Sequence, residues 1–261
     1  MPDATPDHIA RTFDLRVLAA TFTRTCGGAI VGAMADHVRD LGSVRDATER
    51  LLTAAAKLNN DSVAEPSRLP GWTRGHVLAH LARNADALVN VFEGRHMYAS
   101  GEARDAGIER DAPRPLDVQL ADVRESAARF QEAGAAPADW TRTVELRNGV
   151  IDSASNVPFR RWAEVELHHV DLGIGYELED LPAEFTEREI TFLADRFAGH
   201  PEVPPTSLAD STRAWSTGGE AAEPEITVTG PAPELLGWLA GRRDGAGLDV
   251  SGGALPALPP L

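Results

Sequence analysis

The chain is poor in cysteine, in basic side chains and in long apolar runs. Its 261 residues include one cysteine, Cys26, which excludes an internal disulfide framework and leads us to expect a reducing, cytoplasmic environment. No apolar run reaches the roughly 18 residues that a membrane-spanning helix needs. Lys and Arg number 25 against 40 Asp and Glu, a formal net charge of -15. Such a balance argues against nucleic acid or an anionic membrane as a partner, because both bind basic surfaces.

The remaining composition is that of a globular protein, with 43% hydrophobic and 25% charged residues. The length allows one large domain or two modest ones. Residues 1–33 are predicted to be an extension of uncertain order, because charges interrupt their apolar stretch and no regular pattern appears. Two alternatives stay open for this segment. It weakly resembles a cleaved leader, or the functional chain begins near Met34.

Residues 34–179 contain four segments in which apolar residues recur at helical spacing, near residues 36–58, 73–93, 116–133 and 158–176. Thr73 is a candidate N-cap for the second segment. Residues 98–115 contain two glycines and two prolines and are predicted to be a loop. Alternation in residues 140–146, followed by an Arg-Asn-Gly turn, predicts a short hairpin or an extended loop. Four such helices predict a four-helix bundle.

Residues 180–261 have a different pattern. Residues 184–197 and 233–243 read as helices, whereas residues 212–217, 225–230 and 247–252 read as strands. This mixture predicts a small α+β domain after the bundle. The sequence contains no Gly-rich phosphate loop, CxxC pair or nucleophile elbow.

A polar stripe lies along the fourth predicted helix, where Arg161, Glu164, His168 and Asp171 recur at intervals of three or four. A carboxylate and an imidazole four residues apart can reach one cation, since that spacing is about one helical turn. A solvated charged face is the alternative. His80, from a histidine stripe on the second helix, would supply a third ligand, and three protein ligands would leave a position for water or substrate. Such ligands suit zinc or another divalent metal.

Neighbouring side chains leave several readings open. His76 precedes His80 by four residues and is an alternative ligand. His169 points about 100° away from the stripe and is expected to be an outer contact of the site or to be solvated. Asp171 could fix the tautomer of a ligand histidine or could be a charge at the helix end. Trp72 is expected to be a packing anchor where the second helix begins.

Two motifs resemble those of a known family. Residues 69–80, LPGWTRGHVLAH, look like the first motif of mycothiol-dependent maleylpyruvate isomerases, which are DinB-like metal-binding four-helix bundles. Residues 164–173, EVELHHVDLG, resemble the second motif. The resemblance covers most of the chain from Met34 onward and implies that His80, Glu164 and His168 bind zinc. Residues 239–242, LAGR, look like the segment with the family's catalytic arginine, which assigns that role to Arg242.

The resemblance also implies the chemistry. Mycothiol would place its sulfur on the metal as a thiolate, add to the double bond of maleylpyruvate, allow rotation and leave as fumarylpyruvate forms. Arg242 would pair with a substrate carboxylate or stabilise the developing enolate. Cys26 is a poor candidate for a nucleophile because it lies in the extension. The expected partners are a small electrophile and a low-molecular-weight thiol; the alternatives are a mycothiol S-transferase and a non-catalytic metal- or ligand-binding protein. The sequence leaves the oligomeric state open.

Overall fold

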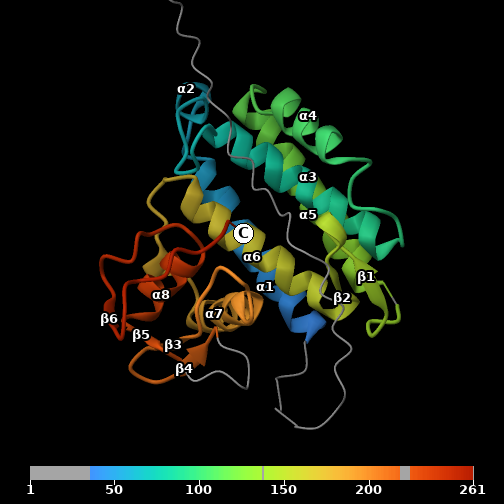
Figure 1. The fold of residues 1–261 in the computed structure, drawn as a ribbon. Helices are drawn as coiled ribbons and strands as arrows, with labels where there is room; N and C mark the ends of the chain where they lie inside the picture. The colour runs from blue at the N-terminus through green and yellow to red at the C-terminus, as the bar shows by residue number, and fades with distance from the viewer. Residues whose placement is uncertain (1–35, 137, 218–223, 261) are drawn as a thin grey trace, which may run out of the picture. The chain divides into compact units, whose positions relative to one another are not determined.

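The computed structural model describes residues 36–136, 138–217 and 224–260. These residues form two compact units that divide between Gly175 and Tyr176 (Figure 1). The first is helical and the second contains a sheet, which is the predicted order of a bundle followed by a small α+β domain. The predicted domain limits, 34–179 and 180–261, stay predictions. The extension 1–33, with Cys26, lies outside the described residues, and so does Met34.

Four long helices build the first unit: α1 (His37–Ala55), α3 (Arg74–Phe92), α5 (Leu116–Ala135) and α6 (Val157–Asp171). They agree with the four predicted helical segments. Helix α3 packs against α5 and α6, and α6 also packs against α1. A short helix, α2 (Asn60–Val63), follows α1. Among the described residues no helix is both long and apolar enough to cross a membrane.

Helix α3 begins at a capping box, as predicted for Thr73. The Thr73 side chain accepts a hydrogen bond from the His76 backbone N–H, and the His76 ring accepts one from the Thr73 N–H. The apolar face that follows is completely buried, with Val77, Leu78 and Leu81 all 0% exposed. The cap fixes where the helix starts, and the buried apolar face fixes its rotation, which leaves His80 and Asn84 facing α6.

Helix α6 has Pro158 in its first turn, where the missing N–H costs nothing. It ends at Asp171, earlier than the predicted residue 176, because Gly173 adopts a φ of 64°. Its apolar side is held on α1 by Glu166, which accepts hydrogen bonds from Trp162 Nε1 at 2.9 Å and from Arg50 Nη2 at 2.5 Å. The polar stripe therefore faces away from α1.

The prediction of a loop over residues 98–115 is wrong. Helix α4 (Gly101–Asp111) occupies most of this segment, with Ser100 as its N-cap. The glycines and prolines do not interrupt this helix. Gly101 is its first residue, and both prolines follow it. Gly107 is buried, and a Cβ at this position would meet only the Arg83 side chain, at 3.9 Å. Of the two predictions for residues 140–149, the hairpin is confirmed and the extended loop is not. Strands β1 (Thr143–Glu145) and β2 (Ile151–Ser153) pair antiparallel across the 3₁₀ turn η1 (Arg147–Gly149), and a second such turn, η2 (Ala154–Asn156), leads into α6.

The second unit comprises a four-stranded sheet with two helices, α7 (Ala183–Phe197) and α8 (Ala232–Leu239), after a short turn, η3 (Leu178–Asp180). The strand order is β4 (Ala214–Ser216), β3 (Thr206–Ala209), β5 (Ile226–Thr229) and β6 (Asp249–Ser251). β3 and β5 are parallel, whereas both edge strands are antiparallel to their neighbours. The sequence patterns missed β3. α8 ends before the predicted residue 243, since Gly241 adopts a φ of 68°.

Candidate metal centre

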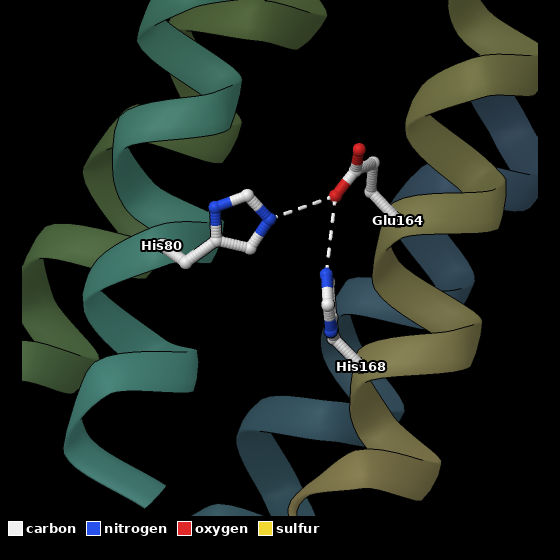
Figure 2. Close-up of side chains that lie close together, drawn as sticks. All are labelled: His80, Glu164 and His168. Atoms are coloured by element: carbon white, nitrogen blue, oxygen red, sulfur yellow. Dashed lines mark hydrogen bonds and ion pairs between the residues drawn. The ribbon is translucent and has the colours of Figure 1, made fainter. Parts of the chain in front are cut away.

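Three side chains from two helices converge between α3 and α6. Glu164 Oε2 lies 2.9 Å from His80 Nε2 and 3.3 Å from His168 Nε2. One potential ligand atom from each residue lies within 4.8 Å of the other two. Figure 2 shows His80 extending from α3 towards Glu164 and His168 on α6. We refer to these three residues as the His/Glu/His cluster.

The fold brings the cluster together in two steps. The α6 helix places Glu164 and His168 one turn apart on one face, as the spacing predicts. Packing of α3 on α6 then brings in His80, whose ring meets the His168 ring edge to face, with centroids 4.7 Å apart. Within residues 36–136, 138–217 and 224–260, no other group of three or more His, Cys, Asp or Glu side chains is placed to hold an ion.

The donor set fits a divalent metal. Two imidazole nitrogens and one carboxylate oxygen are ligands that zinc and several other transition metals accept. His80 and His168 are buried, whereas the Glu164 side chain is 34% exposed, so one side of the cluster is accessible to a small molecule. A site with three protein ligands and one accessible side has the composition of catalytic rather than structural zinc sites.

The protonation of the cluster favours ion binding by His80 and Glu164. Burial lowers the pKa of His80 to about 4, so its ring is neutral at neutral pH. Burial favours the neutral form of Glu164, but hydrogen bonds with His168 and His80 outweigh it and hold the pKa of the carboxyl well below its ordinary value. The pKa of His168 is raised because its bonds with Asp171 and Glu164 outweigh its burial. A metal must therefore displace the His168 proton.

Asp171 supports the cluster from behind His168. Its Oδ2 lies 2.8 Å from His168 Nδ1, and its side chain is fully buried at the end of α6. A proton held on Nδ1 by this carboxylate leaves Nε2, on the cluster side, as the ligand atom. The contact agrees with the expected role of Asp171 in fixing a tautomer rather than with a charge at the helix end.

The neighbouring histidines lie outside the cluster. The His76 ring is engaged in the α3 cap, with Nδ1 2.7 Å from Thr73 Oγ1, and its Nε2 lies 3.4 Å from Glu109 Oε2. His169 is 2% exposed, so the expectation of a solvated ring is wrong: it lies on a buried side of α6. Trp72 packs close to the site, with its ring centroid 5.5 Å from that of His80.

The sequence analysis missed a set of basic and phenolic groups near the cluster. Arg104, on α4, places Nη2 3.3 Å from His80 Nδ1 and lies close enough to Tyr98 for its charge to act on that side chain. Burial raises the pKa of Tyr98 to about 12. Arg147, in the η1 turn, lies close enough to Arg104 and Glu164 for their charges to act on it. These residues come from the segment expected to be a loop and from the hairpin turn, where periodicity gives no signal.

Arg242 belongs to the second unit. It follows α8, and its Nη1 donates to the Ala240 carbonyl oxygen at 2.6 Å. Its predicted catalytic role stays a prediction, and so does the assignment of His80, Glu164 and His168 as metal ligands.

Comparison with known proteins supports one family along nearly the whole described chain. Residues 44–173 match the family model of the mycothiol maleylpyruvate isomerase N-terminal domain, and residues 180–260 match that of the MDMPI C-terminal domain. No curated protein sequence matches the chain.

Two solved structures are similar to the chain. A crystal structure of the mycothiol-dependent maleylpyruvate isomerase is 26% identical, with a TM-score of 0.77 over 86% of this chain and 96% of that one. A histidine-to-alanine mutant of such an isomerase is 25% identical, with a TM-score of 0.76 over the same shares of both chains. The chain belongs to the mycothiol-dependent maleylpyruvate isomerase family.

Proposed function

We propose that the protein is an enzyme that isomerises maleylpyruvate, or a close analogue, to the trans product fumarylpyruvate, using mycothiol and a divalent metal, with zinc as the first candidate. The observation that carries this proposal is the His/Glu/His cluster at the α3–α6 interface of a chain matched by both family domains. The similar solved structure is a mycothiol-dependent maleylpyruvate isomerase.

His80, Glu164 and His168 would hold the ion. When bound, the ion and mycothiol supply a thiolate at neutral pH, which is able to add reversibly to an activated double bond and so permit its rotation. His80 contributes a neutral ring, Glu164 a permanent negative charge, and Asp171 keeps the Nδ1 proton of His168 away from the ion. The predicted contribution of Arg242 is to pair with a substrate carboxylate.

The test combines metal analysis with product analysis. Protein purified without chelator should contain close to one equivalent of a transition metal. Zinc-loaded protein with mycothiol should convert maleylpyruvate to fumarylpyruvate, and chelated protein should not. H80A and E164A should lose both metal and turnover. H76Q is the matched control, since it removes a histidine from the same helix while glutamine preserves the capping box.

Two results would contradict the proposal. Metal-loaded protein that leaves maleylpyruvate unchanged in the presence of mycothiol is not an isomerase of this substrate. Accumulation of a stable mycothiol adduct, without the trans product, would identify an S-transferase instead.

A further inference from the structure

A buried arginine lies beside the His/Glu/His cluster. Arg161, on α6, is 1% exposed and is among the largest completely buried side chains of the described residues. Its Nη1 donates to Asn84 Oδ1, on α3, at 2.8 Å, and Asn84 is itself 4% exposed. A guanidinium therefore lies inside the α3–α6 interface, bonded there by a neutral side chain.

Its place in the bundle relates it to the cluster. Arg161 precedes Glu164 by three residues on α6, and Asn84 follows His80 by four residues on α3. Each residue is thus about one helical turn from a proposed metal ligand, on the face that the two helices share. Glu164 is also the acidic group whose charge acts most strongly on Arg161. The Arg161 and Asn84 pair forms the layer next to the cluster.

The guanidinium has unused donors. Within the described part of the chain, Nε and Nη2 have no hydrogen-bond partner, and no carboxylate lies within 4.0 Å of any Arg161 nitrogen. Burial lowers the pKa of Arg161 to about 10, which still leaves it charged at neutral pH. Glu164 is the strongest counter-charge but does not pair with Arg161 directly, and a buried charge without a direct partner is costly. An anion in contact with Nε and Nη2 would offset that cost.

The unused donors have a specific shape. Nε–H and one N–H of Nη2 lie parallel on one edge of the planar guanidinium, and this edge matches the two oxygens of a carboxylate. The other end, Nη1, is already fixed by Asn84. The edge is therefore oriented in advance, and a carboxylate would not have to order a free side chain.

Further positive charge surrounds the cluster. Arg104 contacts His80, and burial together with the charge of Arg104 lowers the pKa of Arg147. Arg104, Arg147 and Arg161 thus lie near Glu164. A second carboxylate, Asp105, pairs with Arg104 at 2.6 Å, so that among the described residues Arg147 and Arg161 have no carboxylate as a direct partner. A local excess of positive charge in an acidic protein favours a ligand with more than one negative charge.

We propose that Arg161 is a substrate-recognition residue whose Nε–Nη2 edge receives one carboxylate of a small dicarboxylate bound at the His/Glu/His cluster. The inference rests on the proposed function, because maleylpyruvate carries a carboxylate at each end. It adds a second carboxylate-binding arginine, on the bundle, to the one predicted at Arg242.

The test measures binding without turnover. Heptanedioate has two carboxylates at the same chain separation as maleylpyruvate and no reactive double bond, and its diamide is the neutral counterpart. Calorimetric titration of zinc-loaded protein, without thiol, should show that heptanedioate binds at least tenfold more tightly than the diamide. R161M should weaken heptanedioate binding by about 30-fold while leaving the diamide unchanged. R161K keeps the charge but not the paired donors and should weaken binding by about tenfold.

R160M is the matched control, because it removes the adjacent arginine of α6, which pairs with Asp152, and changes the net charge equally. It should bind heptanedioate within twofold of the parent. Equal binding of diacid and diamide, or an R161K protein that binds heptanedioate as tightly as the parent, would overturn the proposal even if R161M failed to fold. A missing isomerase activity would not affect this result, so the two proposals fail separately.

Discussion

His168 and Asp171 share a buried contact in the last turn of α6, in which Nδ1 and Oδ2 are 2.8 Å apart. Because the carboxylate fixes which ring nitrogen carries the proton, D171A should weaken zinc binding by about 100-fold and D171N, which retains an acceptor, by about tenfold. Competition with a chromophoric chelator measures the zinc affinity of both variants. D117N, at an exposed position of α5, makes the same charge change and should bind zinc like the parent. Equal affinity in D171A would show that the contact does not orient the ligand.

Metal binding should stabilise the fold, since an ion that binds only the folded state adds free energy by mass action. With free zinc at about 100 times its dissociation constant, the unfolding free energy should rise by about 3 kcal/mol, which is roughly 5–10 °C in Tm. H168A should lose this shift, and H76Q should keep it. If H168A showed the full zinc-dependent rise in Tm, the ion would bind at another site.

The depressed pKa of His80 predicts acid sensitivity of chelated protein. The unfolded chain takes up a proton near pH 6.5, whereas the folded chain keeps this ring neutral until about pH 4. The unfolded state therefore binds more protons in this window, and stability falls as the pH falls from 6.5 to 4, by up to about 3 kcal/mol. Denaturant unfolding of the parent and H80N across this range should show a smaller loss in H80N. If the unfolding free energies of the parent and H80N fell in parallel with pH, His80 would not be the source of the acid sensitivity.

We expect Arg161 to destabilise the ligand-free protein. Replacing it with methionine removes a buried charge and two donors without partners, at the expense of one unpaired Asn84 oxygen. We expect chelated R161M to be more stable than the parent by about 1 kcal/mol in urea unfolding. R160M loses an ion pair with Asp152 and should not gain stability. A large loss in R161M would indicate that Arg161 has a structural role.

The parts of the site carried by regular helices were predictable from sequence. Thr73 caps α3 as expected, and the four-residue spacing of Glu164 and His168 places both on one face of α6. Pairing these with His80 was an inference from the histidine stripe that the resemblance then supported, because periodicity alone does not tell which helices pack together. His76 had the same spacing to His80, and only the structure shows its ring engaged in the cap.

The parts carried by irregular or short segments were not predictable. Helix α4 has a weakly amphipathic, polar sequence that contains glycines, so its packing on α3 and not its local propensity makes it a helix. Arg104 was missed for that reason. Strand β3 has one large apolar residue, Leu208, and owes its existence to pairing with β4 and β5 on either side. The local sequences of α4 and β3 therefore do not determine these two elements by themselves.

The position of the cluster has a consequence for the order of events as the protein matures. His80 and Glu164 stand 84 positions apart in the chain, whereas Glu164 and His168 are neighbours on one turn. Before α3 and α6 pack, α6 can offer an ion only two ligands, and the unfolded chain must close a long loop to add the third. Complete coordination is therefore a product of folding, and an ion that arrives afterwards would join two distant parts of the chain and slow their separation.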